Sequence, residues 1–128
     1  MMKDFPLNKV FTLIEPGPVL LVTTASGRKK NIMTISWSMP MDFSPTIALL
    51  TGSWNHSFET MMKTRECVLA VPAVDLMEKT VGIGMCSGTD TDKFRKFELT
   101  AGKAQKVRAP LILECLANIE CRVADYVE

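Results

Sequence analysis

Two strand-like runs separated by a short turn constrain the fold of this chain more than any other feature. Residues 19–24 are apolar and β-branched, follow a Pro-Gly-Pro break at residues 16–18, and end at Ser26-Gly27. Residues 31–37 then alternate in polarity, as a strand with two different faces does. The alternation assigns the side chains of this run to two faces: Ile32, Thr34 and Ser36 to one, Met33, Ile35 and Trp37 to the other. The two runs predict a β-hairpin, with the basic residues 28–30 at its solvated tip.

The next segment predicts a strand, a turn and a helix. Pro40 is expected to close the second strand, and residues 46–51 form a third, largely apolar strand. The chain then turns into a helical pattern over residues 57–65, for which Asn55 or Ser57 is the candidate N-cap.

The second half of the chain predicts short elements of both kinds. Residues 67–71 form a strand, and Asp75 followed three residues later by Glu78 is typical of a capping box that starts a helix. Residues 93–97 predict one or two helical turns, and residues 111–123 a long extended stretch. The polar side chains of that stretch indicate an exposed face: Glu114, Asn118 and Glu120. Short strands mixed with short helices predict a mainly β fold.

The length of the chain supports one domain. Two separate cores within 128 residues would each be close to the size at which burial barely offsets conformational entropy. Residues 124–128 still look strand-like, so the chain either finishes with an edge strand or is a piece of a longer polypeptide. We expect a single domain over residues 1–128 that lacks its C-terminal strands.

The charge balance argues against a nucleic-acid partner. The chain has 15 Lys and Arg against 14 Asp and Glu, whereas nucleic-acid binders carry a concentrated excess of positive charge. The N-terminus lacks the design of a secretion signal, and no apolar run has the length needed to cross a bilayer. We therefore expect a cytoplasmic protein without nucleic-acid or membrane partners.

The cysteine spacing predicts free thiols. The four cysteines show neither the close pairs of a zinc site nor the density of a disulfide scaffold: Cys67, Cys86, Cys115 and Cys121. Cys115 and Cys121 stand an even number of residues apart in a strand-like stretch, so we expect both to face one side. This spacing favours mostly buried thiols and argues against a redox-active cysteine pair.

The motifs of several enzyme classes are missing. His56 is the only histidine and has no carboxylate or cysteine at ligand spacing, so we expect neither zinc catalysis nor a Ser-His-Asp relay. Residues 82–88 contain three glycines, but the third is one place late for a dinucleotide fingerprint and the segment follows a helix. The chain has no phosphate loop of the Gly-x-x-x-x-Gly-Lys type either.

Three segments combine small hydroxyl or amide side chains with an aromatic residue or methionine: residues 31–37, 52–58 and 86–94. A flavin carries its own redox chemistry, so its protein needs an apolar wall, backbone donors and an anion site rather than a strong acid or base. The helix start at residues 53–57 offers N–H groups and hydroxyls to a phosphate, and Lys93 adds a charge. These residues alone also fit a simpler interpretation as helix caps and core side chains.

Short blocks in a fixed order strengthen the flavin interpretation. They run along nearly the whole chain: PVLLVTT (18–24), NIMTISW (31–37) with Pro40, residues 56–60, 66–72, 87–88 with 92–94, 109–111, and 120–121. This series resembles the flavin reductase-like domains of the flavoredoxin type. In that family further strands usually follow the equivalent of residues 121–123, whereas five residues follow here.

The resemblance implies an antiparallel, FMN-binding split β-barrel with helices outside, which is usually a homodimer with the flavin near the subunit interface. It implies that the flavin ring is approached, largely through backbone groups, by Asn31, Met33, Thr34, Ile35 and Ser36. It assigns the ribityl chain and phosphate to Ser53, Asn55, His56 and Ser57, and closure of the site to Ser87, Gly88 and Lys93.

The functional hypothesis is an FMN-dependent oxidoreductase. NAD(P)H would reduce the flavin, which would pass electrons to free flavin or to a protein acceptor. One alternative is a non-enzymatic carrier or store that holds FMN without a nicotinamide, and another is an apo domain whose site was lost through truncation. The choices between FMN and FAD, and between NADH and NADPH, stay open.

Overall fold

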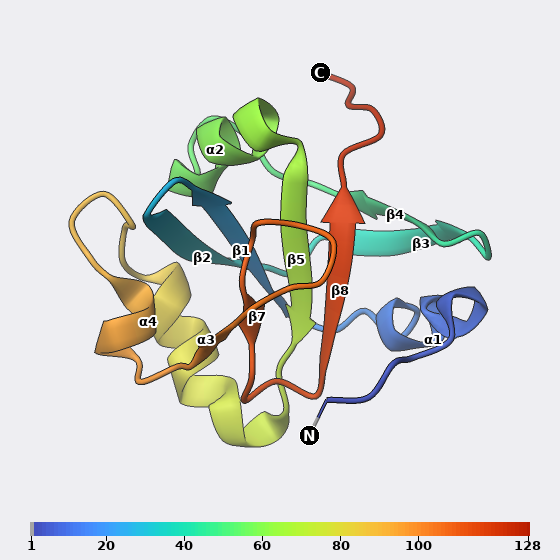
Figure 1. Cartoon of the computed structure of the whole chain (residues 1–128), viewed down its shortest axis with the longest axis horizontal. Helices are drawn as coiled ribbons and strands as arrows, with labels where there is room; N and C mark the ends of the chain where they lie inside the picture. Colours follow the sequence, from blue (N-terminus) through green and yellow to red (C-terminus); the bar gives the residue numbers. More distant parts are fainter. Residues whose placement is uncertain (1) are drawn as a thin grey trace.

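A four-stranded antiparallel sheet forms the centre of the molecule (Figure 1). The structure is a computed structural model that describes residues 2–128. The strands of the sheet lie in the order β2-β1-β5-β8. Their bounds are β1 (Leu20–Ser26), β2 (Lys29–Ile35), β5 (Glu66–Val71) and β8 (Ala117–Arg122). The fold is mainly β with short helices, as the sequence predicts.

The β1–β2 hairpin confirms the predicted alternation. The two strands pair over their whole length, and Gly27 in the turn has a φ of 61°, which glycine adopts without steric strain. Met33 and Ile35 pack on one face of the sheet, and Ile32 packs on the other. Trp37 lies beyond the end of β2 and is exposed.

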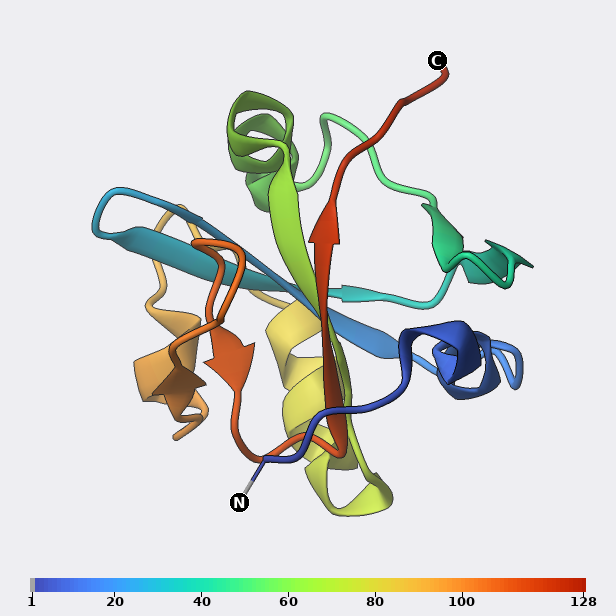
Figure 2. The same cartoon turned by 45° about the vertical axis from the view of Figure 1, so that its right-hand side comes forward.

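Each face of the sheet buries its own apolar cluster. The first face is covered by α1 (Phe11–Ile14), α2 (His56–Thr64) and β4 (Thr46–Leu49). The second face is covered by α3 (Met77–Gly84), α4 (Lys93–Lys96) and β7 (Leu111–Ile112). Figure 2 shows the two layers, with α4 in orange on one side of the sheet and α1 in blue on the other. Short 3-10 turns at Leu7–Lys9 and Val74–Leu76 precede α1 and α3.

The second sheet consists of β3 (Ser38–Asp42) and β4 only. Pro40 lies inside β3, so the prediction that it closes the preceding strand is wrong. β3 pairs with β4 on one side only, and such an edge strand tolerates a residue that has no backbone N–H. The Asp42 carboxylate accepts hydrogen bonds from the backbone N–H groups of Ser44 and Thr46, and the bonds from Ser44 hold the pKa of Asp42 below its usual value.

The helix starts differ in part from the predicted ones. Asn55 occupies the N-cap position of α2, but its side-chain amide donates to Thr51 Oγ1 at 3.0 Å instead of capping the helix. The capping box at Asp75 is wrong, because Asp75 lies in the 3-10 turn and Leu76 takes the N-cap position of α3. The predicted turn at 93–97 is confirmed as α4, whose N-cap Asp92 accepts from the Arg95 N–H.

The C-terminal part is less extended than predicted. Between β6 (Ala101–Gly102), β7 and β8 the chain forms loops, and residues 124–128 lie outside any strand. On β8, the Glu120 carboxylate accepts hydrogen bonds from the loop N–H groups of Gln105 and Lys106, and Asn118 Oδ1 accepts one from the Ile112 N–H of β7. Cys115 lies before β8 and packs in the second cluster while Cys121 packs against the first, so the prediction of one common side is wrong. No helix within residues 2–128 is long and apolar enough to cross a membrane.

Candidate functional site

Two hollows meet where β2 ends and α2 begins. The first has a volume of about 480 Å³ and is lined by Ser53, Asn55, His56, Phe58, Glu59 and Met62. The second has a volume of about 200 Å³ and is lined by Thr34, Ile35, Ser36, Trp37, Leu50, Trp54 and Asn55. Asn55 lines both, so the two hollows adjoin at this residue. The volume of the first hollow falls within the range of small-molecule sites.

The first hollow lies at the N-terminus of a two-and-a-half-turn helix. At the start of α2 the N–H groups of Asn55 and Phe58 donate to Gly52 O and Asn55 O, which leaves those of His56 and Ser57 to face a ligand. The aligned peptide dipoles give this end a partial positive charge. Gly52 makes the turn before the helix possible, because a Cβ there would overlap the Trp54 ring. Trp54 therefore lies against the turn with its exposed surface at the second hollow. The arrangement suits an anion at one end and a flat apolar group at the other.

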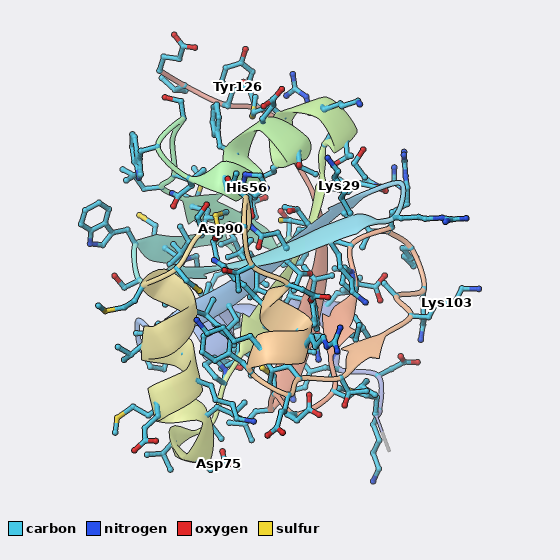
Figure 3. All side chains as sticks on the ribbon, turned by 90° about the vertical axis from the view of Figure 1, so that its left-hand side faces the viewer. Lys29, His56, Asp75, Asp90, Lys103 and Tyr126 are labelled. Atoms are coloured by element: carbon cyan, nitrogen blue, oxygen red, sulfur yellow. The ribbon has the colours of Figure 1, made fainter. Side chains whose placement is uncertain are left out.

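The loop before α4 is tied to the start of α2. His56 Nδ1 lies 3.1 Å from Thr89 Oγ1, and the Ser87 hydroxyl lies 3.0 Å from the same Thr89 oxygen. Figure 3 shows His56 and Asp90 near each other, where this loop approaches the helix. The structure thus brings the predicted segments 52–58 and 86–92 together.

Asn31, Ser57 and Gly88 meet behind the first hollow. Asn31 Nδ2 donates to the fully buried Ser57 Oγ at 2.8 Å, so this hydroxyl anchors α2 to β2 and is not one of the groups lining the hollow. Asn31 Oδ1 is buried without a hydrogen-bond partner among the described residues. The Cα of Gly88 lies so close that a Cβ there would overlap the Asn31 amide.

Replacing Gly88 with alanine is expected to destabilise this junction. The added methyl group would displace the Asn31 amide and break its bond to Ser57, at a cost of about 1–3 kcal/mol in the free energy of unfolding. Urea denaturation measures the loss. Met85→Ala, three residues earlier with a side chain that is 80% exposed, is the control and should change stability by less than about 0.5 kcal/mol. Equal stability of both variants would contradict the tight packing of Gly88 on Asn31.

Lys93 does not line either hollow. Its side chain is only 5% exposed, and Nζ donates to Ile32 O at 2.8 Å and to Ile83 O at 3.0 Å. Burial of the amine lowers its pKa. The ammonium therefore joins β2 to the C-terminal end of α3, a contact that the sequence did not indicate when it assigned Lys93 to closure of the flavin site.

The remaining β2 residues divide between core and site. Met33 is buried in the first cluster, while Thr34 donates to Thr80 O at 2.7 Å and fixes α3 on the strand. Thr34, Ile35 and, just after β2, Ser36 line the second hollow. The sequence did not single out six other lining residues as site residues: Trp37, Leu50, Trp54, Phe58, Glu59 and Met62. All of them except Glu59 are large apolar residues, which a sequence shows equally well as core residues.

Comparison with known proteins agrees with this architecture. The flavin reductase-like domain profile matches residues 14–128. An uncharacterised protein of Archaeoglobus fulgidus is 41% identical over 103 residues, covering 78% of this chain and 57% of the relative. The uncharacterised protein YddH of Escherichia coli is 30% identical over 121 residues, covering 91% and 64%. The chain thus spans about three-fifths of the length of these curated relatives.

Solved structures show the same fold. An FMN-binding domain of a flavin reductase-like enzyme from Shewanella baltica superposes with a TM-score of 0.88 at 23% identity, covering 94% of this chain and 64% of that one. Flavoredoxin of Desulfovibrio vulgaris superposes with a TM-score of 0.83 at 25% identity, covering 100% and 69%. These similarities define the fold class as the antiparallel split β-barrel with short helices. The chain belongs to the flavin reductase-like domain family.

Proposed function

We propose that this protein binds FMN in the two adjoining hollows and acts in flavin-dependent electron transfer. The observation that carries the proposal is that Asn55 lines both the hollow at the N-terminus of α2 and a second hollow, which Trp37 and Trp54 also line. FMN has the matching shape, with a phosphate at one end and a flat ring at the other. The similarity to an FMN-binding domain from Shewanella supports FMN, and the similarity to the Desulfovibrio flavoredoxin supports a flavin.

The residues fit the two ends of FMN in chemical kind. Ser53, Asn55 and His56 offer hydroxyl, amide and imidazole groups beside the N–H groups of α2, which suits a phosphate. The backbone of residues 34–36 and the Trp54 ring suit the edge and the face of a ring system. Asn31 Oδ1, a buried acceptor without a partner among the described residues, lies behind the site and adds a polar group near it.

The protein's own groups would bind and orient the cofactor. FMN, when bound, supplies the hydride and single-electron chemistry. The start of α2 would hold the phosphate, and the apolar wall would exclude water from the ring. Nothing in this scheme requires a side chain to act as a strong acid or base.

We further propose that NAD(P)H reduces the bound flavin, with free flavin or a protein as the acceptor. The rival function is an electron carrier or flavin store that docks no nicotinamide. The open second hollow beside exposed Trp37 and Trp54 favours the reductase, because a second flat ring needs access to the flavin face.

Anaerobic addition of NADH, and separately NADPH, to the FMN-loaded protein tests the reductase. Loss of the visible flavin band within the mixing time or over minutes supports a reductase. A band that persists with both nucleotides, yet bleaches with dithionite, would overturn nicotinamide dependence and favour the carrier. Release of the bound cofactor by heat, followed by chromatography against standards, distinguishes FMN from FAD.

We also propose a homodimer that buries the face around β3 and β4. Several large apolar side chains are exposed on β3 and in the segments next to β3 and β4, and three of them also line the second hollow: Trp37, Met39, Met41, Phe43, Leu50 and Trp54. Monomeric proteins rarely expose so much contiguous apolar surface. A second copy covering this face would also border the flavin site.

Met41→Glu is expected to turn the dimer into a monomer, because it places a charge in the middle of that apolar face. Size-exclusion chromatography with light scattering measures the mass. Leu116→Glu is the control, since Leu116 is 72% exposed against 62% for Met41 and lies in the turn before β8. Figure 1 shows this turn away from β3 and β4. A wild-type monomer, or a dimer that survives Met41→Glu, would rule out this interface.

A further inference from the structure

Two cysteines far apart in the sequence lie directly opposite each other in the sheet. In the antiparallel pairing of β5 with β8, Cys67 is the register partner of Cys121. Both side chains pack on the same face, against the first apolar cluster. Figure 1 shows the two strands side by side along their length. Directly opposed residues of an antiparallel pair have Cα atoms about 4.5–5.5 Å apart, which lies within the range that a disulfide bridges.

The other two cysteines cannot take part in the same pair. Cys115 packs in the second cluster, on the opposite face of the sheet, where burial raises its pKa to about 12. Cys86 follows α3, and its Sγ lies 3.6 Å from Gly82 O. All four thiols are free in this structure. Cys67 and Cys121 are thus the one register-paired set of thiols among the described residues.

From this register and shared packing we propose that Cys67 and Cys121 form a reversible dithiol–disulfide pair that locks β8 onto β5. The spacing of the cysteines along the chain argued against a redox-active pair. Spacing along the chain does not show which residues lie opposite each other in the sheet, and the strand register places Cys67 opposite Cys121.

The two thiols are suited to different roles. Cys67 is buried, at 5% exposure, while Cys121 on the last-but-one position of β8 is half-buried and reachable. The closeness of the two thiols raises the pKa of Cys67 and lowers that of Cys121. Because Cys121 is the more exposed sulfur, we assign it as the attacking sulfur and Cys67 as the resolving one.

A hydroperoxide is the chemical class of oxidant that the pair would consume. The Cys121 thiolate attacks one peroxide oxygen, forming an S–O bond as the O–O bond breaks and hydroxide leaves to take up a proton. The Cys67 sulfur then attacks the Cys121 sulfur, an S–S bond forms, and the S–O bond breaks with loss of water that carries the Cys67 proton. Two thiols lose two electrons, and one hydrogen peroxide becomes two waters.

Hydrogen peroxide added to the fully reduced protein tests the pair without relying on flavin. We expect a mass decrease of two hydrogen atoms per chain, loss of two of the four thiols that N-ethylmaleimide labels in denaturant, and one linked peptide pair containing residues 67 and 121. Dithiothreitol should restore both thiols. The oxidised protein should unfold at a higher temperature than the reduced one, because the bridge constrains the unfolded chain.

Three variants make the result decisive. Cys67→Ser should stop the reaction at a Cys121 sulfenic acid, detected as a dimedone adduct. Cys121→Ser should leave Cys67 unmodified at the same peroxide dose. Cys86→Ser, the matched control, should still form the bridge. Absence of the 67–121 linked peptide in the wild type, or a two-hydrogen mass loss that persists in Cys67→Ser, would overturn the proposal.

Discussion

Lys93→Glu is expected to remove about 3–5 kcal/mol from the free energy of unfolding, a large share of the stability of a small domain. The ammonium of Lys93 is buried and donates to the carbonyl oxygens of Ile32 and Ile83. A carboxylate in its place would face two acceptors without a donor. Urea denaturation followed by circular dichroism measures the change.

Lys93→Met is the matched control for this prediction. Methionine fills a similar space and removes the charge, leaving the two carbonyls without their donor, so we expect a smaller loss of about 1–2 kcal/mol. A Lys93→Glu protein as stable as the wild type, with weakened FMN binding, would instead place Lys93 at the cofactor and contradict the buried bridge.

The difference in the free energy of unfolding between the wild type and Lys93→Met is expected to depend on pH. Burial lowers the pKa of Lys93 from its ordinary value of 10.5. Between the lowered pKa and 10.5 the unfolded chain binds more protons than the folded one, so stability rises with pH across that window. The wild type should therefore gain stability relative to Lys93→Met as the pH approaches 10.5. A difference independent of pH would show that Lys93 titrates normally.

Ser53→Glu is expected to weaken FMN binding about 30-fold. Ser53 lines the hollow at the start of α2, where we propose that the phosphate lies. Like charges about 4–5 Å apart at a protein surface repel by about 3–4 kcal/mol, of which about 2 kcal/mol remains after salt screening. Quenching of flavin fluorescence during titration gives the Kd.

Val74→Glu is the control for added charge. Val74 is 84% exposed in the turn before α3, next to Asp75, which Figure 3 places at the opposite end of the molecule from His56. Its Kd for FMN should equal that of the wild type. Equal weakening in both variants would point to a general charge effect, and no weakening in Ser53→Glu would move the phosphate away from α2.

Local patterns predicted the elements that depend on neighbouring residues. The alternation of Ile32 against Met33 and Ile35 specified both faces of β2, because burial on a sheet has a period of two residues. The turn at Gly27 was predicted for a similar reason: glycine is favoured where a turn needs a positive φ, and Gly27 has one. Pro40 misled because a proline ends a central strand but is accommodated at an edge, and pairing partners cannot be read from one segment.

Contacts between distant segments were outside the reach of the sequence. The role of Lys93 depends on two carbonyl groups from β2 and α3. The local sequence Asp-Lys-Phe does not reveal these contacts, because the same residues could also start an exposed helix. The bond from Asn31 to Ser57 and the opposition of Cys67 to Cys121 arise from strand and helix packing. The candidate site was predicted as three segments. The fold brings residues from two of them, 31–37 and 52–58, to the adjoining hollows.

We propose that the two adjoining hollows at β2 and α2 bind FMN. The most direct test is to incubate the purified protein with excess FMN, desalt it, and record the visible spectrum together with the protein concentration. We predict a retained flavin band at about one FMN per chain, reduced in Ser53→Glu and unchanged in Val74→Glu. A wild-type protein that is folded by circular dichroism but retains no flavin band, and does not quench flavin fluorescence on titration, would contradict the claim.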